Sequence, residues 1–184
     1  MSEQEARKFL FEKVKNKNLV KHCLAVGAIM GYLAEKLNQD VNSWTIAGIL
    51  HDIDYETTKD DPSKHSLEGA AILEVMGLSK EITEAVKTHN EMHGIAPDSL
   101  MAKALFCCDP LSGLIVAATL VLPSKKISDL TTDNIVNRFY EKSFAKGANR
   151  NIIAKCQEYL NLSLKDFSGI GLEAMQKISQ DLEL

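Results

Sequence analysis

Apolar residues recur every three or four positions along most of the chain, and this period constrains the fold more than any other feature. The period is that of an amphipathic α-helix with one buried face. No stretch alternates apolar and polar residues as a half-buried strand would, and no internal repeat is visible. The sequence therefore predicts an all-α protein. The predicted helix over residues 19–37 carries on its inward face His22, Val26, Ile29, Leu33 and Leu37.

Capping residues indicate where several predicted helices begin. Asn42 or Ser43 would cap the third helix, because a short polar side chain can accept from the free backbone N–H groups of the first turn. Asp98 would cap the helix that leads to Asp109 in the same way. Pro110 follows directly, and it either opens a new helix at its first position or bends one continuous helix.

Polar and small residues mark the predicted loops. Residues 54–63 form a polar loop, after which a helix would start at Pro62 or Ser63 and carry His65 on its inward face. Further helices follow beyond a turn at residues 123–126. The 184 residues suit one domain, residues 1–184, with a core of about 18–122 and a C-terminal helical extension of about 128–184.

Composition excludes several classes of protein. The chain is 45% hydrophobic and 25% charged, as is usual for a globular protein, and its formal net charge is −4. That charge argues against a partner that is a nucleic-acid polymer or an anionic membrane. The longest apolar run, Leu114 to Leu122, is too short to span a bilayer, and no secretory signal is visible, so we expect a cytoplasmic protein.

Four of the five histidines lie on, or end, the apolar face of a different predicted helix. A single inward histidine is usually a hydrogen-bonded core residue. Burying four imidazoles and two carboxylates at unrelated places would be costly, whereas convergence on metal removes that cost. Six ligands exceed the need of one tetrahedral ion, which favours two ions sharing a carboxylate. The residues concerned are His22, His51, Asp52, His65, His89 and Asp109.

The order of these residues resembles the H…HD…D signature of the HD-domain metal-dependent phosphohydrolase superfamily. His22, the His51-Asp52 doublet and Asp109 carry that signature, and the intervening His65 and His89 resemble its dinuclear branch, H…HD…H…H…D. The resemblance implies one compact HD-domain helical bundle with additional C-terminal helices.

The surrounding segments are similar to small HDIG-type hydrolases of unassigned substrate. Residues 47–54, 65–70, 108–115 and 144–150 carry this similarity, which covers most of the chain. Two features depart from the family patterns. Asp54 stands where the motif that names the HDIG group has glycine, and the long glycine-proline motif of the HD-GYP branch is missing, which disfavours hydrolysis of cyclic di-GMP.

The resemblance also implies roles for the six residues. His22, His51, Asp52 and Asp109 would hold a first metal, and Asp52 would bridge to a second held by His65 and His89. The cofactor would be one or two divalent transition-metal ions, from among Fe, Mn, Zn and Ni. A metal-activated hydroxide, with Asp52 as the catalytic ligand, would cleave a phosphomonoester or phosphoanhydride, with a nucleotide as the expected small phosphorylated substrate. A homodimer is compatible with this assignment.

Four more residues are candidates for contact with the substrate. Lys59 and Lys64 are cations that could meet phosphate, and Arg150 follows a Gly-Ala-Asn loop at a helix start that could cradle an anion. His93 could donate a proton to the leaving group.

Two other functions fit the same signature. The first is a non-catalytic HD module that binds a nucleotide, although a retired site has no physical need of six ligands. The second is an HD-type di-iron oxygenase, which ligands alone do not separate from a hydrolase because the difference lies in the redox activity of the iron.

Overall fold

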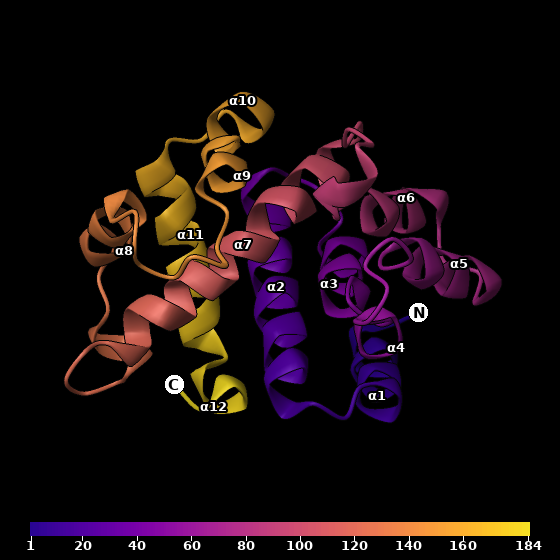
Figure 1. Ribbon diagram of the computed structural model, residues 1–184, viewed down its shortest axis with the longest axis horizontal. Coiled ribbons are helices and arrows are strands. Elements are labelled where there is room, and N and C mark those ends of the chain that lie inside the picture. The colour runs from indigo at the N-terminus through magenta and orange to yellow at the C-terminus, as the bar shows by residue number, and fades with distance from the viewer.

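Two long helices, α2 (Lys17–Lys36) and α7 (Leu100–Leu120), cross in the middle of the molecule (Figure 1). The computed structural model describes all residues 1–184 and contains no strand, which confirms the all-α prediction. Helices α1 and α3–α6 lie on one side of α2, and α8–α12 on the other. Their bounds are α1 (Glu3–Lys13), α3 (Val41–Leu50), α4 (Tyr55–Thr58), α5 (Leu67–Val75), α6 (Lys80–Thr88), α8 (Thr132–Tyr140), α9 (Arg150–Ala154), α10 (Cys156–Leu160), α11 (Leu164–Lys177) and α12 (Ser179–Leu182), with the 3₁₀ turns η1 (Glu91–His93) and η2 (Ile127–Asp129).

The packing of α2 against α3 depends on two facing glycines. A Cβ atom added at Gly48 would lie 2.7 Å from the Cα atom of Gly27 and 2.8 Å from the carbonyl oxygen of Val26. Backbone atoms cannot move aside as a flexible side chain can, so the close approach requires glycine here. The same crossing brings His22 on α2 beside His51 at the end of α3.

Helix α7 continues through Pro110 without a break, so of the two predicted possibilities the single helix is correct. Its N-cap is Ser99 rather than the predicted Asp98, and the Ser99 hydroxyl accepts from the backbone N–H of Ala102. By length and composition α7 could cross a membrane, which the shorter run at Leu114 to Leu122 could not. However, 61% of its apolar window is buried inside the protein, as expected for a core helix.

Two other predicted helix starts are wrong. Helix α3 is capped by Asp40, whose Oδ1 accepts from the N–H of Ser43 at 2.7 Å, and not by Asn42 or Ser43. The helix predicted from Pro62 or Ser63 begins only at Leu67, because residues 62–66 form turns that end at Ser66, where φ is +71°. His65 therefore precedes a helix instead of lying on one.

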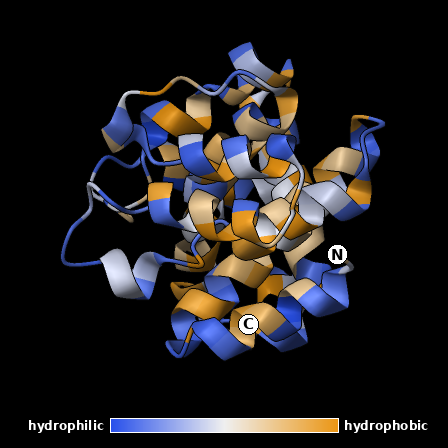
Figure 2. Cartoon of the chain, turned by 90° about the vertical axis from the view of Figure 1, so that its right-hand side faces the viewer, coloured by the Kyte–Doolittle hydropathy of each residue, from blue (hydrophilic) through white to orange (hydrophobic).

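The hydrophobic core runs through both sides of the molecule. Buried side chains from α1 to α12, among them Leu10, Trp44, Leu111 and Phe167, belong to one connected cluster. Figure 2 shows the hydrophilic residues concentrated on the outlying loops and the hydrophobic ones gathered toward the middle. All four cysteines are free and buried, and burial raises the pKa of Cys107 to about 12, so this thiol stays protonated at neutral pH.

Candidate metal centre

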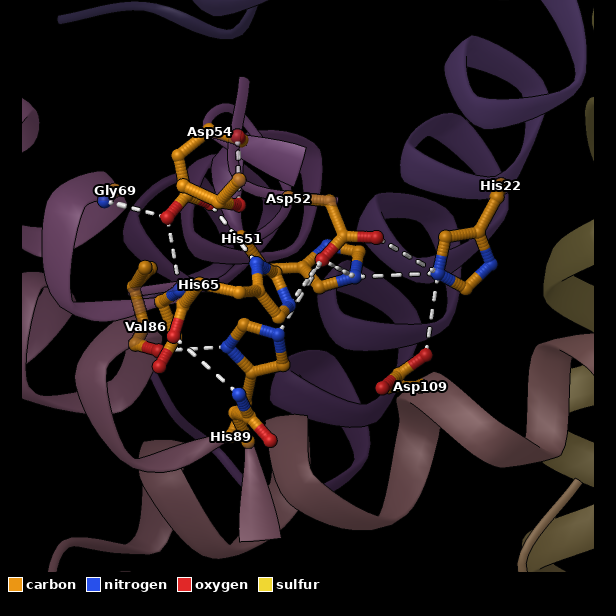
Figure 3. A network of polar contacts seen from close by, with 12 residues as sticks. His22, His51, Asp52, Asp54, His65, Gly69, Val86, His89 and Asp109 are labelled. Carbon is orange, nitrogen blue, oxygen red and sulfur yellow. Dashed lines mark hydrogen bonds and ion pairs between the residues drawn. The ribbon is translucent and has the colours of Figure 1, made fainter. Parts of the chain in front are cut away.

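Six side chains from five separate parts of the chain point at one another in the interior (Figure 3). They are the six residues that the histidine pattern selected in the sequence. Their positions are His22 in α2, His51 and Asp52 just after α3, His65 before α5, His89 at the end of α6 and Asp109 in α7.

Asp52 lies at the middle of this cluster. Its Oδ1 is 3.3 Å from the Nε2 atoms of both His65 and His89 and 3.5 Å from that of His51. Its Oδ2 is 3.6 Å from Nε2 of His22. The two oxygens of one carboxylate therefore face the two sides of the cluster, as a bridging ligand would.

His22 defines the second side. Its Nε2 lies 3.2 Å from Nε2 of His51 and 3.1 Å from Oδ1 of Asp109. Nitrogen and oxygen atoms that share one ion at metal–ligand distances of about 2.1 Å are themselves roughly 3.0–3.4 Å apart. The spacing in the cluster suits metal ligands.

The outward ring nitrogens fix the tautomer of two histidines. Nδ1 of His51 is 2.8 Å from the carbonyl oxygen of Gly48, and Nδ1 of His89 is 2.6 Å from that of Val86. A carbonyl oxygen only accepts, so each Nδ1 carries the hydrogen and donates it. Each Nε2 then directs a lone pair into the cluster.

The other two histidines are held by side chains. Nδ1 of His65 donates to Oδ1 of Asp54 at 3.1 Å. Nδ1 of His22 lies 3.1 Å from the hydroxyl of Ser112, which itself donates to the carbonyl oxygen of Asp109. Partners of this kind orient metal-bound imidazoles in proteins.

This arrangement fits a bound cation. Lone pairs on His51 and His89 face the carboxylate of Asp52, so acceptors meet acceptors with no donor between them. A proton or a metal ion at the centre relieves that repulsion. Two triads have all their ligand atoms within 4.8 Å of one another: His22, His51 and Asp109, and His51, Asp52 and His89.

The surroundings shift the pKa values of these groups in opposite directions. Burial lowers the pKa of His51 to about 4 despite the nearby charge of Asp52. Burial also opposes a charge on His65, but hydrogen bonds to Asp52 and Asp54 outweigh it and raise the pKa of His65 to about 9. The neighbouring histidines hold the pKa of Asp52 well below its usual value against the effect of burial, so Asp52 is an anion.

Arg150 does not fit the predicted phosphate contact. All five of its N–H donors point at backbone carbonyl oxygens, at distances between 2.6 and 3.4 Å. The guanidinium therefore organises the loop between α8 and α9, and no donor remains for an anion. The acceptors are the carbonyl oxygens of Arg138, Phe139, Phe144, Ala145 and Ala148.

The other three candidates for substrate contact, Lys59, Lys64 and His93, have no side chain in the cluster. Lys59 is exposed after α4, and Lys64 is exposed and pairs with Asp61 at 3.5 Å. His93 lies in η1, and its Nε2 donates to the carbonyl oxygen of His65 at 2.7 Å. His93 thus supports the backbone of a cluster residue, which differs from the predicted role of proton donor.

Two residues that hydrogen-bond cluster histidines, Asp54 and Ser112, are not predicted as site residues from the sequence. The motif comparison presents Asp54 only as a departure from the pattern and gives Ser112 no role. The available signal for Asp54 is a carboxylate two residues after the doublet, next to predicted ligands. Nothing in the sequence marks Ser112, because its contact with His22 joins residues 90 positions apart.

A cleft of about 190 Å³ opens beside the cluster. His65, His89 and Asp109 form its floor, and Phe106, Pro110 and Ile152 contribute apolar wall. At the rim, Nδ2 of Asn149 donates to Oε1 of Glu91 at 3.0 Å, linking the loop before α9 to η1. The remaining lining residues are Asn90 and Gly147.

Comparison with known proteins agrees with this geometry. The model of the HD domain family matches residues 19–114, which contain all six cluster residues. Ribonuclease Y of Nitratidesulfovibrio vulgaris (strain DP4) is 31% identical over 142 residues, covering 74% of this chain and 27% of the relative. Ribonuclease Y of Alkaliphilus metalliredigens (strain QYMF) is 30% identical over 174 residues, covering 90% of this chain and 35% of the relative.

Ribonuclease Y of Lawsonia intracellularis (strain PHE/MN1-00) is 28% identical over 138 residues, covering 73% of this chain and 26% of the relative. The chain thus spans between about a quarter and a third of the length of these relatives. The family match covers more than half of the chain and includes the buried histidine and aspartate cluster. The chain belongs to the HD-domain family, and its buried histidine and aspartate cluster is consistent with the metal-dependent phosphohydrolases of that superfamily.

Proposed function

We propose that this protein is a metal-dependent hydrolase that cleaves a phosphomonoester or phosphoanhydride bond of a nucleotide. The observation that carries the proposal is the opening of the cleft directly onto His65, His89 and Asp109. A phosphoryl group in that cleft would touch cluster residues on one side, while the rest of the molecule would lie against Phe106 and Ile152.

Two sets of residues would hold the metal. His22, His51 and Asp109 form one side, and Asp52, His65 and His89 form the other, with Asp52 facing both. The bound ions supply positive charge against the phosphoryl oxygens and a water molecule of lowered pKa.

The chain's own groups orient the reactants. The carbonyl oxygens of Gly48 and Val86 fix the rings of His51 and His89, so the ligands require little rearrangement when a substrate enters. Glu91 and Asn149 line the polar part of the cleft and can hydrogen-bond a sugar or base, whereas the amide of Asn90, which also lines it, is already paired with the backbone of Pro62, His65 and Met92. Glu91 at the rim disfavours a long polyanion at that point.

An RNA phosphodiester is the second candidate substrate. It is favoured by the similarity to several proteins named Ribonuclease Y, and it is disfavoured by the net charge of −4 and the acidic rim. The two candidates differ in the length of the anion that must pass Glu91.

The test is a comparison of substrates with and without the central carboxylate. Metal content would be measured on protein purified without chelator, and product release on a panel of nucleoside mono-, di- and triphosphates and short RNA oligomers with added Mn²⁺. We expect release of phosphate from a nucleotide by the wild type and none by Asp52→Ala. Cleavage of RNA alone would select the second candidate, and two irons without any hydrolysis would favour an oxygenase.

A further inference from the structure

His65 is the one histidine of the cluster whose place is not set by a helix. His22 and Asp109 lie inside helices, and His51 and His89 directly continue α3 and α6. His65 lies in a turn, followed by Ser66 at φ +71°, a conformation that L-residues other than glycine adopt rarely. Its position must therefore be fixed by contacts from elsewhere.

Asp54 supplies those contacts through both oxygens of one carboxylate. Oδ1 accepts from Nδ1 of His65 at 3.1 Å, and Oδ2 accepts from the backbone N–H groups of Ser66 at 2.8 Å and Gly69 at 2.9 Å. One carboxylate thus holds the imidazole ring, the turn after it and the first turn of α5. Asp54 is only 1% exposed, and such burial of a carboxylate is stable only with a full set of donors.

Gly69 gives independent support for this arrangement. A Cβ atom at position 69 would lie 3.0 Å from Oδ1 and 3.1 Å from Cγ of Asp54. The space that a side chain at residue 69 would need is taken by the carboxylate. Glycine at position 69 therefore leaves room for the carboxylate of Asp54.

The backbone of His65 is fixed from the other side by η1 and the residue before it. Nε2 of His93 donates to the carbonyl oxygen of His65 at 2.7 Å, and Nδ2 of Asn90 donates to the same oxygen at 3.3 Å. Because the backbone of His65 is held at its carbonyl oxygen, the imidazole ring can move only by rotation about its side-chain bonds. Asp54 at Nδ1 and the predicted ligand Asp52 at Nε2 restrict that rotation, and the ring of Tyr55 packs edge-on against the imidazole. Of the two carboxylates, Asp54 is the one that stays on the ring when Nε2 binds metal.

We infer that Asp54 is a positioning residue that controls metal occupancy on the His65–His89 side of the centre, independently of the His22–Asp109 side. The inference rests on the proposed metal-dependent function. Asp54 hydrogen-bonds one ligand of that side and contacts none of the other. Loss of a group that orients a metal-bound histidine typically weakens metal binding by about 10- to 100-fold.

The test is a Mn²⁺ titration of the metal-free full chain by isothermal titration calorimetry, for the wild type and Asp54→Asn. The amide keeps the size of the side chain but replaces one acceptor oxygen with a donor, so one of the three N–H groups loses its partner. We expect two equivalents in the wild type. In Asp54→Asn we expect one site of unchanged affinity and a second weakened by about 10- to 100-fold.

Asp61→Asn is the matched control, because it makes the same chemical change at a half-exposed carboxylate four residues before His65, whose side-chain partners are Ser63 and Lys64 and not a cluster residue. It should titrate like the wild type. Gly69→Ala is a second test that keeps the carboxylate and displaces it, and it should weaken the same site. It also replaces Asp54→Asn if that variant fails to fold by circular dichroism.

Three results would overturn the inference: two tight sites in both Asp54→Asn and Gly69→Ala, equal weakening of both sites, or a single site in the wild type. These results are separable from a failure of the proposed function. A wild type that binds two ions but hydrolyses no phosphate ester would refute the hydrolysis and leave the role of Asp54 intact.

Discussion

The molecule contains two concentrations of polar atoms, one at the half-buried Arg150 and one at the metal centre, and they are built in opposite ways. Around Arg150, every donor meets a carbonyl oxygen, two of them in the last turn of α8 and three in the loop between α8 and α9. In the metal centre, the outward ring nitrogens are all hydrogen-bonded, but the inward lone pairs of His51 and His89 face the carboxylate of Asp52. A buried polar group whose hydrogen bonds are all made within the protein stabilises the fold. Acceptor atoms that converge with no donor between them indicate a binding site for a cation that the chain itself does not supply.

The largest expected effect is that of Asp52→Ala on hydrolysis. Removing the carboxylate that faces both sides of the centre should lower kcat by about 10³-fold or more, because the charge that holds the metal and orders the site is lost. Phosphate release and metal content measure this. A variant that keeps its metal and more than a tenth of its activity would show that Asp52 does not bridge.

Arg150→Ala should affect the other cluster and leave the metal centre intact. Five carbonyl oxygens lose their donor, so the free energy of unfolding should fall by on the order of 3 kcal/mol. Urea unfolding measures this, and metal content should stay that of the wild type. The half-exposed Arg138, which pairs with Glu141 and lies over the ring of Phe144, is the nearest control, and Arg138→Ala should cost about 1 kcal/mol. Loss of metal from Arg150→Ala would contradict the division between the clusters.

Removal of metal by a chelator should lower the melting temperature of the wild type but not that of a variant without the metal centre. Metal that binds only the folded chain stabilises it by about 2.7 kcal/mol at a free concentration 100 times Kd, so a chelator should lower Tm of the wild type. The same treatment should leave Tm of Asp52→Ala unchanged. Differential scanning calorimetry would decide, and an equal shift in both proteins would place the metal elsewhere.

The metal-free protein should be most stable near pH 6.5. Between pH 4 and 6.5 the unfolded chain binds a proton at His51 that the folded chain refuses, so the free energy of unfolding rises with pH. Between pH 6.5 and 9 the folded chain keeps the His65 proton that the unfolded chain has released, so the free energy falls. Urea titrations across this range test the shape, and a steady rise through pH 9 would contradict it.

The smallest effect is expected at the exposed lysines. Lys59→Ala and Lys64→Ala should change kcat/KM by less than about twofold, because surface substitutions away from buried features have small effects. A tenfold rise in KM for either variant would support the phosphate contact predicted from the sequence. Steady-state kinetics on the preferred nucleotide measures both.

The six cluster residues were predictable because each lies on, or just after, an apolar face with a regular period. His65 was the exception in detail, since the break at Pro62 and the unusual φ of Ser66 place it in a turn. Arg150 could not be assigned from sequence, because an arginine at a helix start looks the same whether it faces an anion or the carbonyl oxygens of its own loop. Asp54 was visible but not interpretable, because its donors lie 11 to 15 residues away.

The hydrogen bond from Asn149 to Glu91 joins the two parts of the chain that form the cleft. The metal ligands lie within residues 19–114, but one wall of the cleft comes from Gly147, Asn149 and Ile152, beyond the family match. Part of the proposed substrate-binding surface thus lies outside the stretch that holds the metal ligands. We expect substitutions at Gly147, Asn149 or Ile152 to change which substrate fits the cleft, while Arg150 and the predicted metal ligands stay as they are.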